Sequence, residues 1–186
     1  TYYNLVLSPS ATGNPTYTLA TTTGQTITCN GTTTIGDGTN LVTVTAFTYN
    51  PTLDLIGNFG ISANATFTAP TSSSFSIAGN WSNSGSFVHS TSTVLFDAAG
   101  TGRTINTGGT STGKTFYNIE FNNSLGGWTI QTNNLLAINN FLLTNASSTA
   151  GSFTVQSGRT IEVRGVFSNS VGGDITAWAN STLYLN

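Results

Sequence analysis

The chain has 186 residues, of which four are basic and six acidic, and its net charge at pH 7 is −2. So few cations cannot supply the electrostatic footprint that nucleic acid or an anionic membrane surface requires, so we expect neither partner. Hydrophobic content of 37% and aromatic content of 11% are sufficient to bury a core, which excludes a disordered chain. No apolar run approaches the length of a membrane-spanning helix.

Short β-strands are predicted from the first residues to the last, because apolar and polar residues alternate with a period of two. The inward pairs, in chain order, are Leu5/Leu7 with Tyr3 before them, Ile27/Cys29, Leu53/Leu55, Phe75/Ile77, Ile161/Val163 and Leu183/Leu185. Gly, Asn, Ser and Pro separate these runs, and strong helix formers are scarce. The predicted fold class is all-β. The single cysteine, Cys29, is interpreted as a small buried hydrophobe.

Internal repeats organise these strands. A strand followed by Gly-Asn and an aromatic residue ends at Phe59 in LIGNF and 22 residues later at Trp81 in IAGNW. Glycine or asparagine at this corner favours a left-handed backbone. Longer matches pair TYYNLVL with TFYNIEF, LDLIGNF with IEVRGVF, and STVLFD with STLYLN. We therefore predict a first module over 1–114 and a partial second module over 115–186.

A period near 22 residues predicts a β-solenoid, specifically a right-handed parallel β-helix, whose coils stack about 4.8 Å apart. The chain would form eight or nine coils and a rod about 40 Å long. A β-sandwich is the alternative, since it also has many short strands with regular turns. The sandwich does not predict landmarks that recur in the same order, so the solenoid is favoured.

The stretch SFSIAGNWSNSGSFVHSTSTVLFDAAGTGRTI and the later KTFYNIEFNNS resemble the tandem modules of large secreted microbial surface proteins, the adhesin-like right-handed parallel β-helices. The resemblance covers nearly the whole chain. Its motifs are structural, so it implies the fold and an extracellular or cell-surface location rather than an activity. The sequence departs from that pattern in showing no recognisable leader, anchor or end cap.

Strand edges at the two ends of a solenoid are normally hidden by atypical terminal repeats. Here core-like alternation continues to both ends, and the expected interface residues are Tyr3, Leu5 and Leu7 at one end and Leu183, Tyr184 and Leu185 at the other. We expect a structural unit of an extracellular fibre, stalk or coat that joins copies of itself head to tail, or neighbouring repeats of a longer chain. The alternative is a glycan-binding adhesin module that uses exposed aromatics such as Tyr2, Tyr49 or Trp178.

Catalytic and metal chemistry is not expected, and neither is a cofactor. The acidic residues are spread along the chain, and Glu162 with Arg164 is interpreted as an exposed ion pair; an acid–base pair that includes Glu120 is the weakest alternative. IGDGTN (35–40) is interpreted as a turn rather than a calcium loop. Threonine runs at 21–23, 26–28, 32–34 and 43–45 are too unevenly spaced to predict an ice-binding array, and outward threonines simply suit strands.

Six Asn-x-Ser/Thr sequons occur in the chain. Five are candidate N-glycosylation sites on predicted turns, at Asn30, Asn64, Asn122, Asn145 and Asn180. The sixth, Asn80, is less suited because it lies at the tight corner before Trp81.

Overall fold

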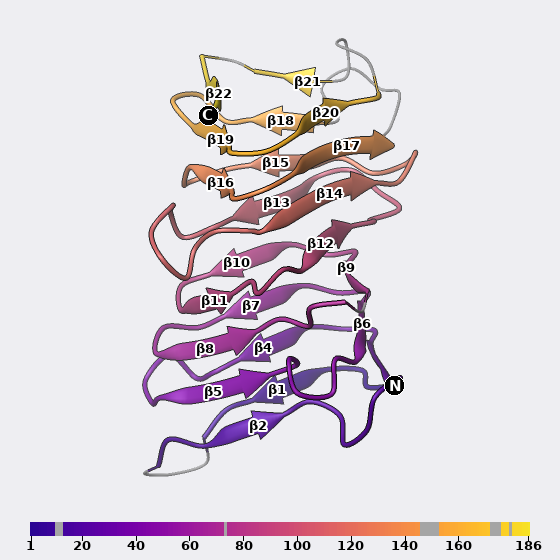
Figure 1. The fold of residues 1–186 in the computed structure, drawn as a ribbon, viewed down its shortest axis with the longest axis vertical. Helices are drawn as coiled ribbons and strands as arrows, with labels where there is room; N and C mark the ends of the chain where they lie inside the picture. The colour runs from indigo at the N-terminus through magenta and orange to yellow at the C-terminus, as the bar shows by residue number, and fades with distance from the viewer. Residues whose placement is uncertain (10–12, 73, 146–152, 172–175, 179) are drawn as a thin grey trace.

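The computed structural model describes residues 1–9, 13–72, 74–145, 153–171, 176–178 and 180–186. Within these residues there is no helix, hence none able to span a membrane, and all sheets are parallel and stack as a β-solenoid of about seven turns (Figure 1). The parallel β-helix prediction is confirmed. The β-sandwich is excluded, because its sheets are antiparallel.

The strands of the described residues form four sheets. Sheet B contains β1 (Leu5–Leu7), β4 (Thr33–Ile35), β7 (Phe59–Ile61), β10 (Trp81–Asn83), β13 (Arg103–Asn106), β15 (Trp128–Ile130), β18 (Phe153–Val155) and β21 (Thr176–Ala177). Sheet A contains β3 (Thr26–Cys29), β6 (Thr52–Leu55), β9 (Phe75–Ile77), β12 (Thr93–Phe96), β14 (Asn118–Asn122), β17 (Phe141–Asn145) and β20 (Phe167–Asn169). Sheet C contains β2 (Thr16–Thr18), β5 (Val42–Thr45), β8 (Ala65–Thr68) and β11 (Ser86–Val88), and sheet D contains β16 (Leu135–Ala137), β19 (Thr160–Val163) and β22 (Thr182–Leu185).

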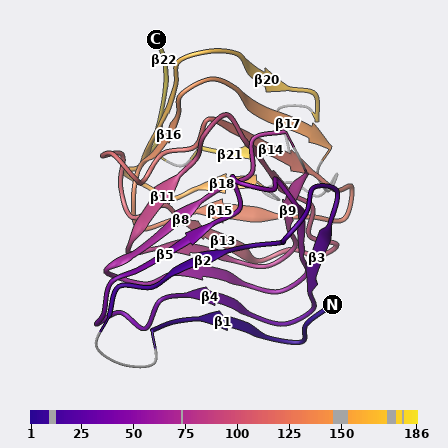
Figure 2. The same cartoon turned by 60° about the horizontal axis from the view of Figure 1, so that its bottom comes forward.

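Each turn passes around a three-sided prism, through sheet B, then sheet C or D, then sheet A. The first turn, β1 to β3, shows this path near the N-terminus (Figure 2). Phe59 and Trp81, 22 positions apart, are direct neighbours in sheet B, as the repeat predicted. Leu5 and Thr33 are also direct neighbours but 28 positions apart. The expectation of eight or nine turns is therefore wrong, because longer corner loops lengthen most turns.

The prism is filled by inward side chains, and its middle and C-terminal turns contain a continuous column of aromatic rings. Ring-to-ring contacts lead from Phe59 through Trp81, Phe116 and Phe121 to Trp178, with neighbouring centroids 4.9–6.4 Å apart. Such pairs add about 0.5–1.5 kcal/mol each beyond the area that they bury. In the first two turns the core is mainly aliphatic, with Tyr17 packed against it, and it includes Cys29, which is fully buried as predicted.

Glycine at the corner between sheets A and B is required for a reason other than the predicted left-handed backbone. Gly57 and Gly79 are not among the positive-φ glycines of the described chain. Instead, the corners stack so closely that a Cβ on Gly57 would lie 2.1 Å from the Gly31 carbonyl oxygen, and one on Gly79 would lie 2.2 Å from that of Gly57. The close approach of successive backbones excludes any side chain there.

Asparagine at the same corner links neighbouring turns. The Oδ1 atom of Asn58 accepts a hydrogen bond from the Asn80 backbone N–H at 2.9 Å, and Asn80 Oδ1 accepts one from the Thr104 N–H at 2.8 Å. Asn4 does the same for Thr32 at 2.8 Å. The amide side chain thus satisfies a backbone donor where the chain leaves the sheet, which explains the Gly-Asn repeat.

Residues 107–116 cross the third side of the prism between sheets C and D without forming a strand. The Phe87 N–H donates to the Gly113 carbonyl, and the Phe116 N–H donates to the Leu136 carbonyl, so this segment occupies the place of one turn. Lys114 Nζ donates to the backbone oxygen of Asn83 at 3.0 Å, and partial burial lowers the lysine pKa. The segment is therefore held against the stack by its own backbone and by one lysine.

Candidate functional site

The N-terminal edge of the stack consists of β1, β2 and β3. Leu5 and Leu7 point inward and pack against the core, as predicted. Tyr3 is 77% exposed, so the prediction that it belongs to the inward alternation is wrong, while its assignment to an interface stays a prediction. Tyr3 lies at the corner before β1, where its carbonyl accepts the Gly31 N–H and the Cys29 thiol, so the strand alternation does not reach it.

The C-terminal edge ends in β22, which pairs with β19 along one side only among the described residues. Leu185 continues an inward row formed by Ala137 and Val163 in sheet D. Those two are fully buried, whereas Leu185 is 58% exposed. The neighbouring Tyr184 is outward and 53% exposed. Leu185 therefore has the orientation of a core residue without a covering turn.

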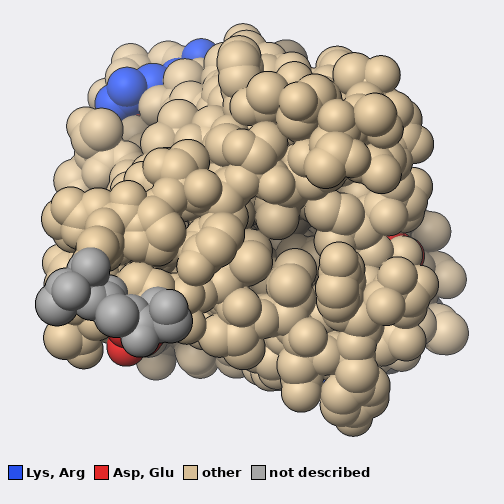
Figure 3. Space-filling view, turned by 90° about the horizontal axis from the view of Figure 1, so that it is seen from below, with Lys and Arg blue, Asp and Glu red and all other residues tan. Residues whose placement is uncertain are grey.

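Charge is almost absent from both ends. Residues 1–31 contain no Asp, Glu, Lys or Arg, and residues 166–186 contain only Asp174, which lies outside the described residues. Figure 3 views the N-terminal end and shows charged side chains only at its rim. Natural proteins often protect exposed strand edges with lysine or other charges. The described strands β1, β2, β3 and β22 carry no charged residue.

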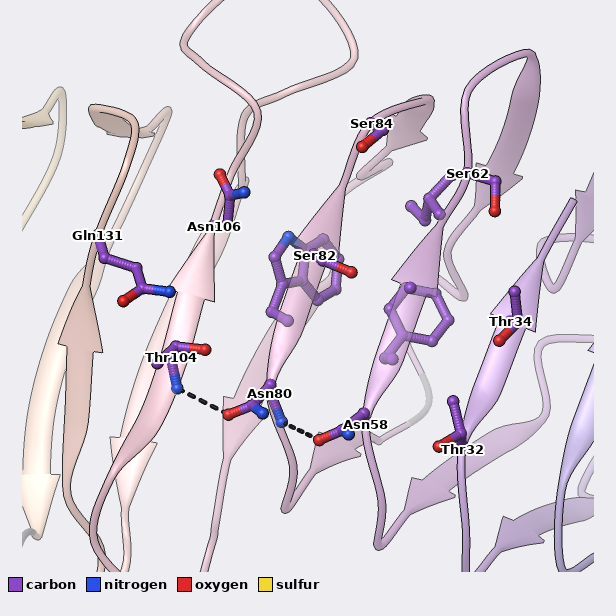
Figure 4. A pocket seen from close by; sticks show the side chains of 14 residues that line it. Thr32, Thr34, Asn58, Ser62, Asn80, Ser82, Ser84, Thr104, Asn106 and Gln131 are labelled. Atoms are coloured by element: carbon purple, nitrogen blue, oxygen red, sulfur yellow. Dashed lines mark hydrogen bonds between the residues drawn. The ribbon is translucent and has the colours of Figure 1, made fainter. Parts of the chain in front are cut away.

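A groove runs across the outer face of sheet B, over β4, β7, β10 and β13 (Figure 4). Its lining contains no charged side chain and consists mainly of hydroxyl and amide groups, supplied by Thr32, Thr34, Asn58, Ser62, Asn80, Ser82, Ser84, Thr104, Asn106 and Gln131. Gly60 leaves its floor open, since it presents no side chain between Thr34 and Ser82. This groove could not be predicted from the sequence, because only the strand register brings its residues together.

The aromatic residues proposed for glycan binding do not form one platform. Tyr2 is exposed beside the first turn, and Tyr49 is half-buried in the loop before β6. Trp178 belongs to the last turn, where it is half-buried against Phe153 and Phe167, with centroids 6.4 and 6.3 Å apart. Its assignment as an exposed aromatic is wrong, because it closes the aromatic column.

The two glutamates considered from the sequence, Glu162 and Glu120, lie on different sheets. Glu162 lies on sheet D and forms the predicted ion pair, its Oε1 accepting from Arg164 Nε at 2.8 Å. Glu120 lies on sheet A, where it accepts from Thr144 Oγ1 at 2.7 Å. Among the described residues, no group of three His, Cys, Asp or Glu side chains lies together so that it could hold a metal ion.

Asp37 forms the turn that the sequence predicted. Its Oδ1 atom accepts the backbone N–H groups of Thr39 and Asn40, each at 2.8 Å. These hydrogen bonds lower the pKa of the carboxyl from its ordinary value of 3.8 to about 2. The carboxylate is therefore occupied within its own loop.

The sequon asparagines differ in accessibility. The side chains of Asn30, Asn64, Asn122, Asn145 and Asn180 are exposed. Asn80 is half-buried, and its Oδ1 belongs to the corner hydrogen bonds. For Asn145, the two following residues of the sequon lie outside the described residues.

Comparisons with known proteins found no relative of this chain. No family model, curated protein or solved structure matches the chain.

Proposed function

We propose that the protein is a structural rod that joins copies of itself head to tail at the surface of a cell or outside it. The observation that carries this proposal is the inward row Ala137, Val163 and Leu185, which is buried in two turns and uncovered in the third. A further turn placed on β22 would cover Leu185. The resemblance to secreted surface modules supports the location.

The N-terminal edge has the chemistry to supply that turn. Parallel strands expose complementary backbone donors and acceptors on their two sides, so the first turn of one copy can pair with the last turn of another. Leu5, Leu7 and Ile27 are inward and only partly covered, as is Leu183 at the other edge. The two contacting surfaces differ, and such heterologous contacts build open filaments.

The test compares Leu185→Asp with Tyr184→Asp. Both residues lie on β22 and are similarly exposed, but only Leu185 faces the interior of the stack. Burial of an unpaired carboxylate between two turns is costly, so we expect Leu185→Asp to abolish association and Tyr184→Asp to weaken it less. Light scattering over a concentration series and negative-stain electron microscopy measure the assemblies.

A wild-type chain that stays monomeric at high concentration would contradict head-to-tail assembly and favour a rod whose edges are covered by neighbouring repeats of one longer polypeptide. Equal loss in both variants would show that association does not use the inward row. Thermal unfolding of each variant shows whether the monomer keeps its fold.

The groove on sheet B favours a second candidate function, recognition of a neutral glycan. Hydroxyl and amide side chains without charge suit the hydroxyl groups of an uncharged polysaccharide. A Ser82→Trp substitution would fill the groove, while Ser168→Trp changes an outward serine on sheet A and serves as its control. Saturable binding to a neutral glycan array that Ser82→Trp alone removes would support this function, and an array without binding would exclude it for the glycans tested.

A further inference from the structure

Sheet C carries a two-dimensional array of hydroxyl groups on its outer face. Its strands are in register, so Thr16, Thr43 and Thr66 form one row across three turns. A second row, two positions further along the strands, contains Thr18, Thr45 and Thr68. The fourth strand continues the rows with Ser86 and Val88. Figure 1 shows the four strands β2, β5, β8 and β11 stacked one above another.

This array could not be predicted from the sequence, because the threonine runs are unevenly spaced along the chain. Of the threonine runs at 21–23, 26–28, 32–34 and 43–45, only the last belongs to the array, and it contributes Thr43 and Thr45. The other members come from TYT and ATFT, which the differing loop lengths place 27 and 23 residues from their partners. An ice-binding array needs the same pair of threonines on successive turns, and the folded chain has such a pair on three successive turns.

The hydroxyl groups of this array are available to water. Thr16, Thr18 and Thr43 are exposed, and the other three threonines are partly exposed. Of the six, only Thr45 has a described side-chain hydrogen bond, which its Oγ1 accepts from the Phe47 N–H at 3.2 Å. The four strands contain no charged residue. The array therefore presents a regular surface of hydroxyl and methyl groups without strongly hydrated ions.

The spacing of the array is set by the backbone. Alternate residues on a strand lie about 6.7 Å apart, and adjacent strands lie about 4.8 Å apart. These two repeats are close to those of the oxygen atoms on a prism face of hexagonal ice. A single row can match a lattice in one direction only, whereas two rows match it in two.

The array is also held rigidly. Val42, Val44 and Phe67 alternate with the threonines and are buried in the core. Threonine is β-branched, so its χ1 angle has few alternatives on a packed strand. Hydroxyl groups fixed before contact lose little conformational entropy when they bind a surface.

We propose that this threonine array, Thr16, Thr18, Thr43, Thr45, Thr66 and Thr68, is an ice-binding face. The partner is the surface of an ice crystal, whose water molecules match the hydroxyl positions. The other sides do not provide such a face. Outward positions on sheet A include Asp54 and Glu120, and sheet B has one threonine row, Thr104, Thr129 and Thr154.

The test is to hold a single ice crystal in a solution of the purified chain and to measure thermal hysteresis and crystal shape. Thr66→Tyr places a bulky ring within the array, on β8. Thr129→Tyr makes the same change at an outward, partly exposed position on β15 of sheet B and is the matched control. We expect faceted crystals and hysteresis with the wild type and with Thr129→Tyr, and the buffer level with Thr66→Tyr.

The proposal is overturned if the wild-type chain neither shapes the crystal nor produces hysteresis. It is equally overturned if Thr66→Tyr and Thr129→Tyr retain the same activity, because sheet C would then not be the contacting face. Circular dichroism checks the fold of each variant. Should Thr66→Tyr fail to fold, Thr43→Tyr tests the same row at a more exposed position.

Discussion

Sheets C and D lie on the same side of the prism, before and after residues 107–116, yet they are built differently. Sheet C has an inward row of Tyr17, Val44, Phe67 and Phe87, of which three are aromatic, and a shorter inward row of Val42 and Ala65. Sheet D also has two inward rows, but all their side chains are aliphatic: Leu135, Ile161 and Leu183 beside Ala137, Val163 and Leu185. The outward residues also differ: hydroxyl groups dominate on sheet C, and Leu136, Glu162 and Tyr184 lie on sheet D.

Sheet D instead shares its sequence pattern with sheet A. The stretch LDLIGNF (53–59) runs along β6 of sheet A and turns into β7 of sheet B. Its match IEVRGVF (161–167) runs along β19 of sheet D and turns into β20 of sheet A. The repeat therefore specifies a strand, a tight corner and the next strand, but not the side of the prism on which they lie. The division into modules 1–114 and 115–186 stays a prediction.

The largest expected difference between the two sheets is in their contribution to the core. Phe67→Ala removes a fully buried ring that contacts Phe59, Phe75 and Phe87. We expect the free energy of unfolding to fall by about 3–5 kcal/mol. Ile161→Val, in sheet D, removes only one carbon from a buried side chain, and for that reason it should cost about 0.5–1.5 kcal/mol. Denaturant unfolding measures both, and similar losses would contradict the role assigned to the aromatic column.

The crossing between sheets C and D depends on Gly108. Its φ is +80°, and a Cβ there would lie 2.0 Å from the Asn83 carbonyl oxygen. Gly102 has the same φ but open space around it, so Gly102→Ala measures the backbone strain alone. We expect Gly108→Ala to cost about 1–3 kcal/mol more than Gly102→Ala, as overpacking does. Equal thermal stability of the two variants would show that the crossing can shift without cost.

The pKa values of two carboxyl groups are shifted in opposite directions. Asp37 lies in the corner before sheet C, and Asp97 follows a strand of sheet A. The Asp37 pKa is lowered to about 2 by hydrogen bonds from Asn40 and Thr39. Its ionised form therefore stabilises the fold above about pH 4, and this contribution is lost as the pH falls through 2. Burial, with a smaller contribution from the Asp54 charge, raises the Asp97 pKa above 3.8. Ionised Asp97 therefore destabilises the fold at neutral pH, and acidification through its pKa removes that cost.

Carboxyl titrations by NMR should place Asp37 below and Asp97 above their ordinary values. Asp37→Asn should lower stability at pH 7, and Asp97→Asn should raise it. Titration of both groups near 3.8 would contradict these environments.

Much of this fold could be predicted from local sequence. Alternation identified the strands, and the spacing of Phe59 and Trp81 gave the length of one turn. The number of turns was wrong because loop lengths vary, and loops leave no periodic signal. The corner glycines were identified for the wrong reason, since the contact that excludes a side chain at Gly57 comes from Gly31, one turn away.

The candidate sites were harder to predict for the same reason. The alternation of Leu183 and Leu185 can be recognised in the sequence. That Leu185 is exposed at the edge of the stack could be seen only in the structure. The groove on sheet B and the array on sheet C are products of register between turns. Thr43 and Thr66 become neighbours only when the chain between them is folded, so no local pattern could show their alignment.

The smallest expected effect concerns the charges on the outer face of sheet D. Glu162 and Arg164 form their ion pair with side chains 24% and 47% exposed, and such pairs contribute about 0–1 kcal/mol. A double-mutant cycle with Glu162→Gln and Arg164→Gln should give a coupling energy in this range that decreases with added salt. Because the two residues are only two positions apart in the chain, this coupling is local to one turn and does not join neighbouring turns. A coupling well above this range would contradict the interpretation of the pair as an ordinary exposed ion pair.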